Sequence, residues 1–399
     1  MADIQVAIEA PPREAMSLSD RLETAALLAL FGLTAFVQVS IAISQSLLAL
    51  ACLGWIGMLL ARRERPDAPR FFWPLLAYAL ATLLSAAFSR SPAISFIDSK
   101  QLVLFVVVPL VYRLASGARS SALLTVIISV GAASAAFGIF QYGLLHYDQL
   151  VQRPQGTLGH YMTYSGLLML VIAVALSRIL FGTGERLWAA LVMPALILAI
   201  ALTSTRNAWV GVCAAGALLL ALKDFRLLAV IPVVAALVFA AAPARITQRF
   251  NSMFDASDPT RRDRVAMLRE GRQMVRAHPL VGVGPNMVKE VYAEYRDPQA
   301  VEKVNPHLHN VPVQIAAERG LPAVALWAWF IGILGLDLWR QFRSGTQRVL
   351  AAAGLAAVIA MLVAGLFEYN FGDSEFLMLF LIVVTLPFAA SRPAVHARA

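Results

Sequence analysis

Long apolar segments alternate with short polar turns along most of the chain. An apolar stretch of about 20 residues is long enough to cross a bilayer as a helix. Runs such as 102–111 and 349–366 are continuously apolar, which favours helices over the alternating strands of a barrel. The pattern therefore predicts an all-α, polytopic membrane protein with about 12 transmembrane helices. We place them near 23–43, 46–61, 71–89, 101–115, 120–145, 160–181, 186–203, 206–222, 226–242, 321–339, 348–367 and 375–390.

One longer polar segment, 243–320, interrupts this pattern. It divides the chain into 1–242 with nine predicted spans, the polar loop itself, and 321–399 with three spans and a tail. Within the loop, apolar residues at helical spacing predict an amphipathic helix over 264–277 that lies at the membrane interface. Residues 279–285 hold two prolines and two glycines and predict a turn, and no Walker motif follows them.

Composition excludes a soluble globular protein. Hydrophobic residues make up 59% of the 399 residues and charged residues 14%, whereas soluble domains are about 45–50% apolar. The net charge of +9 does not indicate nucleic-acid binding, because many arginines mark helix ends instead of forming one basic domain. Cys52 and Cys213 lie in apolar runs, which argues against a disulfide framework or a thiolate metal site. The first apolar run, 25–43, is too long for a cleaved signal peptide and predicts an uncleaved span.

The basic residues of the short turns predict the orientation. Most of them fall in every second turn, where positive charge marks the cytoplasmic side. Both termini are therefore predicted to be cytoplasmic, and the loop 243–320 periplasmic if the cell is Gram-negative. A loop of more than about 60 residues crosses largely regardless of its charge. The basic residues of these turns are Arg62, Arg63, Arg65, Arg70, Arg119, Arg186, Lys223, Arg226, Arg340, Arg343 and Arg348.

Arg206 follows a tight turn and opens a predicted helix on the same outer side. A helix N-terminus together with a guanidinium group is suited to bind an anion, and arginine grips phosphate oxygens in a bidentate manner. The alternative is an arginine that reaches toward lipid headgroups. The long loop adds further arginines, most of which we expect to face solvent or headgroups. These are Arg245, Arg249, Arg261, Arg262, Arg264, Arg269, Arg272 and Arg276.

The loop ends in His307-Leu308-His309-Asn310, followed by a predicted helical stretch over 311–319. Gly320 is expected to end this stretch, and Pro322 to lie in the first turn of the next span. His309 would then stand at a helix start, where a neutral imidazole can take a proton from a hydroxyl group. The His-x-His pair could instead bind a metal or be structural, although no nearby motif supplies the remaining ligands.

Two more polar turns face the same side. The turn from Arg153 to His160 and the turn from Glu368 to Asp373 each join two predicted spans with polar, turn-forming residues. Either turn could line a sugar-binding cleft, and either could be an ordinary polar connection.

The residues around His309 resemble the signature of the O-antigen ligase and Wzy-type polymerase superfamily. His309-Asn310 is followed by nine residues and Gly320, as in that signature, whereas Ala323 departs from its last position. Arg206 in Ser204-Thr205-Arg206, and Arg264 ahead of the 279–285 turn, are similar to the family's two arginines. The turn that begins at Arg153 resembles its Arg-x-x-Gly-Thr element.

This resemblance implies an O-antigen ligase of a Gram-negative inner membrane. Such an enzyme transfers a polysaccharide from undecaprenyl diphosphate to lipid A–core oligosaccharide, with inversion and without cofactor, metal or nucleic-acid partner. By the resemblance, Arg206 and Arg264 contact the diphosphate and His309 is the general base. Substrate-binding roles are expected for Arg153, His160, Asn310, Arg261, Arg269, His307 and Asp373.

Alternatives remain open at this stage. An O-antigen polymerase or a protein O-oligosaccharyltransferase would use the same kind of donor with another acceptor. A transporter or flippase would be expected to show repeated halves and ionisable residues in mid-membrane. A purely structural membrane protein would leave the corner formed by His307-Leu308-His309-Asn310 without a role.

Overall fold

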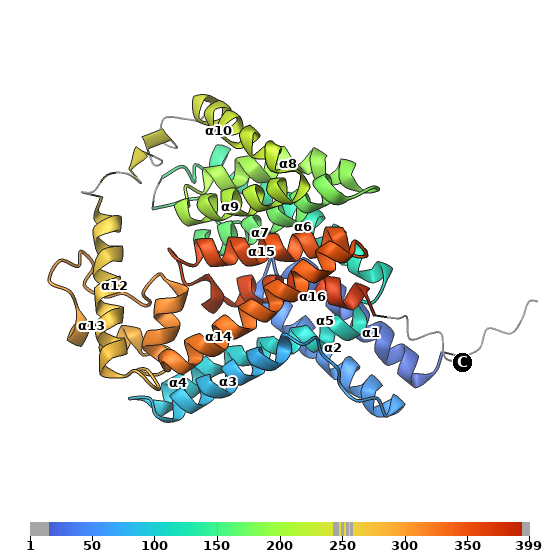
Figure 1. Cartoon of the computed structure of the whole chain (residues 1–399), viewed down its shortest axis with the longest axis horizontal. Helices are drawn as coiled ribbons and strands as arrows, with labels where there is room; N and C mark the ends of the chain where they lie inside the picture. Colours follow the sequence, from blue (N-terminus) through green and yellow to red (C-terminus); the bar gives the residue numbers. More distant parts are fainter. Residues whose placement is uncertain are drawn as a thin grey trace, which may run out of the picture.

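The computed structural model describes residues 16–149, 151–241, 247–248, 251–252, 255 and 258–392. Within these residues all regular secondary structure is helical, which confirms the all-α class (Figure 1). Arg245 and Arg249 lie outside the described residues. The α-helices and 3-10 helices (η) are α1 (Leu18–Phe36), α2 (Ile41–Arg62), α3 (Phe72–Ala87), α4 (Pro92–Asp98), η1 (Ser99–Val106), α5 (Val107–Leu114), α6 (Ala118–Gly143), α7 (Tyr161–Phe181), α8 (Arg186–Leu202), α9 (Arg206–Lys223), η2 (Phe225–Ala229), α10 (Val230–Ala241), α12 (Pro259–Ala277), α13 (Val288–Tyr295), α14 (Val311–Ser344), α15 (Arg348–Ala364), η3 (Asn370–Gly372) and α16 (Ser374–Ala390).

The helices have the composition of an integral membrane protein. Among the described residues, five helical segments are long and apolar enough to cross a bilayer: α2, Pro92–Leu114, α6, α7 and α14. Four shorter helices, α3, α8, α15 and α16, are also apolar. Each predicted span coincides with a helix, but the prediction of about 12 crossings goes beyond these segments and stays a prediction.

Several predicted boundaries are wrong. The first helix was expected over 23–43, but α1 ends at Phe36 and α2 begins at Ile41. The Oγ of Ser17 accepts a hydrogen bond from the backbone of Asp20, so α1 begins before its apolar run. The fourth segment begins at Pro92 instead of 101, because proline is favoured in the first turn of a helix. Helix α13 was not predicted at all.

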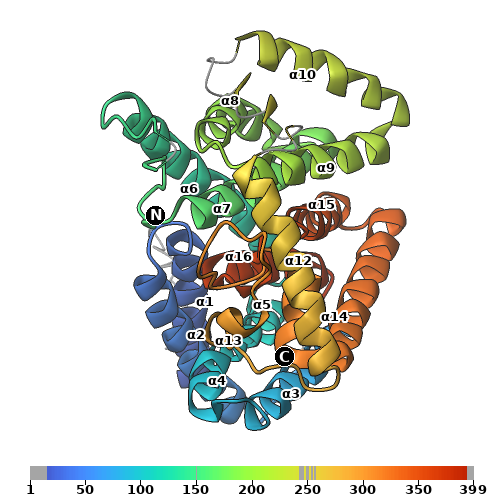
Figure 2. The same cartoon turned by 90° about the vertical axis from the view of Figure 1, so that its left-hand side faces the viewer.

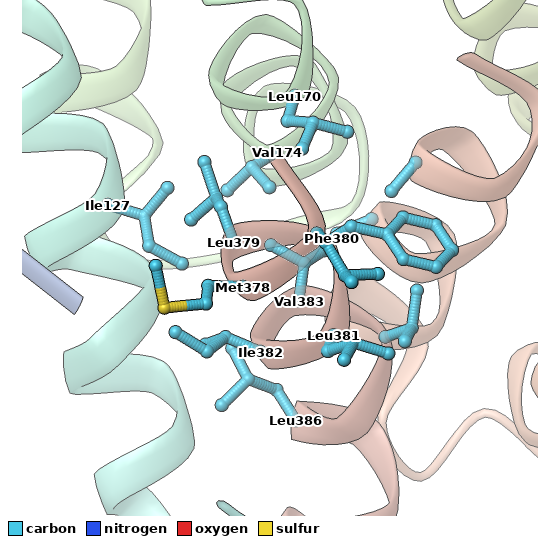
Figure 3. Close-up of a cluster of buried hydrophobic side chains, with 14 of the residues drawn as sticks. Ile127, Leu170, Val174, Met378, Leu379, Phe380, Leu381, Ile382, Val383 and Leu386 are labelled. Atoms are coloured by element: carbon cyan, nitrogen blue, oxygen red, sulfur yellow. The ribbon is translucent and has the colours of Figure 1, made fainter. Parts of the chain in front are cut away.

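Helix α16 forms the centre of the bundle. Its side chains are buried almost all round, against α5, α6, α7 and α15. In Figure 3, Ile127 of α6 and Leu170 and Val174 of α7 surround Met378 and Leu379 of α16. Apolar positions on every side of a helix are typical of a fully buried one.

Close packing holds the start of α9 in place. A Cβ atom at Gly211 would lie 2.2 Å from Sδ of Met169 and 3.2 Å from the carbonyl oxygen of Ala360. In a lipid environment, small residues at such contacts allow helices to approach closely. Gly211 thereby fixes Arg206, one and a half turns earlier, against α7 and α15.

Helix α12 lies across one end of the bundle, with α13 beside it (Figure 2). A second buried cluster joins both helices to the segment that precedes α14. Its members are Met267, Met274, Val283, Met287, Val288, Val291, Leu308 and Ala317. The amphipathic helix predicted over 264–277 is therefore real, and it begins earlier, at Pro259. The end of α16 lies at the opposite end of the bundle (Figure 1).

Candidate active site

The corner before α14 is held by hydrogen bonds on both sides of His309. Asn310 caps α14: its Oδ1 accepts from the backbone of Val313 and its Nδ2 donates to the carbonyl of Leu366, each at 3.0 Å. The backbone N–H of Leu308 donates to Oε1 of Gln314 at 2.7 Å. Between them His309 has φ 47°, a left-handed conformation that is uncommon for residues other than glycine. Such a strained residue persists only where its surroundings fix it.

Gly320 interrupts α14 as the sequence predicted. Its backbone has φ 80° and ψ 171°, and a Cβ atom there would lie 2.2 Å from the carbonyl oxygen of Leu280. Leu321 donates a backbone hydrogen bond to Pro279, and Val283 donates to Ala317. The turn at 279–285 therefore packs against the break in α14 and braces it.

Glu368 joins the two histidines of the corner. Its Oε2 lies 2.9 Å from Nδ1 of His309, and its Oε1 lies 3.7 Å from Nε2 of His307. The ring centroids of the two histidines are 4.1 Å apart. Because Nδ1 of His309 faces a carboxylate, Nε2 is the nitrogen that can accept a proton.

The surroundings set the charges of this group. Burial acts to raise the pKa of Glu368, which is only 8% exposed, but its hydrogen bond with His309 and the electrostatic attraction of the two imidazole rings outweigh burial. The pKa of Glu368 is thereby lowered to about 2, so it is ionised at neutral pH. Burial lowers the pKa of His307 to about 4, against the attraction of Glu368, so His307 is neutral.

Arginines line a cavity of about 400 Å³ in front of His309. Arg206 is the first residue of α9, and its guanidinium group lies 2.8 Å from Oδ2 of Asp258. Asp258 also caps α12, because its Oδ1 accepts from the backbone of Thr260 and Arg261. The lining includes Arg153, Tyr161, Arg206, Arg261, Arg264, Leu308, His309, Asn310 and Phe367.

Arg264 approaches from α12 and donates to the carbonyl of Phe367, next to Glu368 in the chain. Burial lowers its pKa, partly against the attraction of Glu368, although arginine remains protonated in proteins. Arg153 stacks on Tyr161, with Cζ 4.0 Å from the ring centroid. Two helices, α9 and α12, and the loop before α7 thus direct positive charge at a single cavity.

A second cavity of about 210 Å³ lies on the other side of Glu368. Much of its polar lining comes from the two turns that the sequence singled out, and His307 and Asn207 add to it. Nδ1 of His160 accepts from the backbone of Thr163, and Asp373 caps α16 while accepting from the hydroxyl group of Thr163. Met162 and Asn207 line both cavities. The polar lining includes His160, Thr163, Asn207, His307, Glu368, Tyr369, Asn370 and Asp373.

Nine of the ten predicted site residues line these two cavities. Arg269 lines neither: it lies 3.4 Å from Asp297 and donates to Gln299, toward α13. Sequence reasoning missed Asp258 as the partner of Arg206 and Glu368 as the partner of His309. The available signal was an acidic residue, Glu368, directly after an apolar helix, where charge is costly without a partner.

Residues 191–328 match the family model described as O-antigen ligase. The match runs from α8 to the middle of α14 and contains Arg206, Arg264 and His309. No curated protein matches the chain. The arrangement of arginines around a carboxylate-bound histidine lies largely within this region and is completed by Glu368 from outside it. Residues 191–328 of this membrane protein therefore match a domain of the family described as O-antigen ligase.

Proposed function

We propose that this protein is an inverting glycosyltransferase that moves O-antigen polysaccharide from undecaprenyl diphosphate to lipid A–core oligosaccharide. The observation that carries the proposal is the pairing of His309 with buried Glu368, beside a cavity lined by Arg206 and Arg264. A base and two phosphate-binding groups thus meet at one place, as a transfer from a lipid diphosphate requires.

The proposed reaction needs only these groups. Nε2 of His309 takes the proton from an acceptor hydroxyl group as its oxygen attacks the anomeric carbon of the donor. The bond between that carbon and the diphosphate oxygen breaks on the opposite face, so the configuration inverts. Arg206 and Arg264 neutralise the charge that develops on the departing diphosphate. Glu368 stabilises the imidazolium that forms, as a carboxylate does in a catalytic triad.

The fold is compatible with a periplasmic site. The site lies at the end of the bundle covered by α12, and the end of α16 lies at the opposite end (Figure 1). Basic residues near the ends of α2 and α5 form ion pairs, Arg62 with Glu23 and Arg113 with Glu64. Positive charge in short turns marks the cytoplasmic side. We therefore propose an inner-membrane location with cytoplasmic termini and a periplasmic site.

Loss of the gene in its host tests the proposal. We expect lipid A that carries bare core, with long polymer still attached to undecaprenyl diphosphate. A polymerase would instead leave cores that carry a single repeat unit, and this outcome would refute the ligase assignment. Complementation with His309→Ala should fail, whereas Arg272→Ala, at an exposed position of α12 outside both cavities, should restore the parent pattern.

A second test addresses the two arginines. Arg206→Lys and Arg264→Lys should recover little of the transfer lost in the alanine variants, because an ammonium group cannot grip a diphosphate in a bidentate manner. Transfer rates with purified donor and acceptor in detergent measure this. Lysine variants as active as the parent would exclude the bidentate grip.

A further inference from the structure

We propose that His307, His309 and Glu368 also form a binding site for a divalent transition-metal ion such as Zn²⁺, and that its occupation switches the enzyme off. The metal site stands on geometry alone, whereas the inhibition rests on the proposed role of His309. One ligand atom from each residue lies within 4.8 Å of the others, and the group is largely enclosed.

The distances suit a single ion. Zn²⁺ binds imidazole nitrogen at about 2.0–2.1 Å and carboxylate oxygen at about 2.0–2.2 Å, so ligand atoms in a tetrahedral site lie about 3.4 Å apart. The two pairs in question are 2.9 Å apart, between His309 and Glu368, and 3.7 Å apart, between His307 and Glu368. For these two pairs, shifts of less than 1 Å reach the tetrahedral spacing.

The ligand types also suit a transition metal. Two imidazoles and one carboxylate form a ligand set of catalytic zinc sites, whereas Mg²⁺ and Ca²⁺ prefer oxygen. Nδ1 of His307 is buried and has no hydrogen-bond partner among the described residues, so either ring nitrogen can turn toward the ion. The second cavity, lined by His307 and Glu368, offers space for a water molecule as the fourth ligand.

Metal binding and proton transfer exclude each other at His309. A neutral imidazole carries one N–H group, so a metal on Nδ1 obliges Nε2 to hold the proton. Nε2 is then a donor and can no longer accept a proton from the acceptor hydroxyl group. The positive charge of Arg264, which acts on both Glu368 and His307, weakens cation binding. We therefore infer a reversible, inhibitory ion.

Cobalt spectroscopy tests the site without any assay of transfer. The purified protein, stripped with EDTA, is titrated with Co²⁺, and visible d–d bands should appear and disappear when Zn²⁺ is added. His307→Gln, His309→Gln and Glu368→Gln should each weaken Co²⁺ binding at least tenfold. His278→Gln, at an exposed histidine after α12, should bind like the parent. Absence of bands, or bands that survive all three substitutions, would overturn the proposal.

Pulsed EPR of the Cu²⁺-loaded parent protein tests the site without any variant, so the result does not depend on whether the variants fold. The spectrum should show two coordinated imidazoles, and one or none would also overturn the site. Transfer assays with Zn²⁺ then test inhibition, which EDTA should reverse. If Co²⁺ binds at the three residues but Zn²⁺ leaves transfer unchanged, the inhibition and the base role of His309 are both wrong. If the parent shows no transfer at all, the proposed function fails while spectroscopy still decides the metal site.

Discussion

At the scale of single residues, the unusual pair is His309 and Glu368. A buried carboxylate beside an imidazole fixes both the tautomer and the direction of the ring. The left-handed backbone at His309 shows that neighbouring contacts, and not local preference, determine where this ring points.

A double-mutant cycle tests whether the pair acts as a unit. His309→Ala should lower kcat by about two to four orders of magnitude, the usual contribution of a positioned base. Glu368→Gln should also lower kcat, and the double variant should be no slower than His309→Ala alone. Measured KM for the donor should change little. Independent, multiplicative losses in the double variant would show that Glu368 acts elsewhere.

The partly buried His307 predicts a specific pH dependence of stability. Its pKa is lowered from 6.5 to about 4 in the folded protein. Between these values the unfolded chain binds a proton at His307 that the folded protein does not, so the free energy of unfolding falls as the pH decreases. In EDTA, His307→Gln should therefore lose less thermal stability than the parent between about pH 7 and about pH 5. The control His278→Gln should follow the parent, and equal slopes for His307→Gln and the parent would contradict the prediction.

At the scale of elements, the break in α14 positions the corner. Gly320 lets the short first part of α14 turn away from the longer, apolar part, and the turn at 279–285 packs against this break. Helix α14 thus serves two purposes, since its first part presents His309 and its second part lies in the bundle.

Gly320→Ala should destabilise the protein by about 1–3 kcal/mol, the usual cost of a non-glycine residue in strained backbone. The added Cβ would also meet the carbonyl of Leu280. Gly335→Ala is the matched control in the same helix, because a Cβ there meets nothing within 4 Å. The midpoints of thermal unfolding in detergent measure both. A Gly320→Ala variant as stable as Gly335→Ala would show that the break is not required.

The sequence predicts elements better than it predicts contacts. Hydrophobic period, glycine and proline placed the helices and the break at Gly320, because these signals are local. Helix α13 was missed because it is only eight residues long, although Val288, Val291 and Tyr292 recur at helical spacing. The contacts of Glu368 with His309 and of Asp258 with Arg206 join residues 59 and 52 positions apart, and only tertiary packing determines them.

At the scale of the whole molecule, the helix directions place the site and the charged turns at opposite ends of the bundle. The short basic turns therefore set the orientation of the protein in the membrane, and this orientation sets the side on which the site lies.

Cysteine labelling tests this orientation. In a background without Cys52 and Cys213, Arg272→Cys in α12 should react with an impermeant reagent added from the periplasm. Arg63→Cys, after α2, should react only once the inner membrane is opened. The reverse pattern would place the site in the cytoplasm, where neither the donor nor the acceptor of the proposed reaction presents its sugars.

The ion pair between Arg206 and Asp258 has a consequence for how the enzyme turns over. Under the proposed function, the donor diphosphate must displace the carboxylate of Asp258 before Arg206 can bind the diphosphate. Donor binding then exchanges one anion at Arg206 for another. The gain in binding free energy is therefore smaller than it would be at an arginine without an ion-pair partner. Asp258 is also the N-cap residue of α12. Each exchange of anions at Arg206 therefore also acts on the helix that covers the site. After the sugar has been transferred, the carboxylate of Asp258 competes with the diphosphate for Arg206. This competition favours release of the undecaprenyl diphosphate carrier.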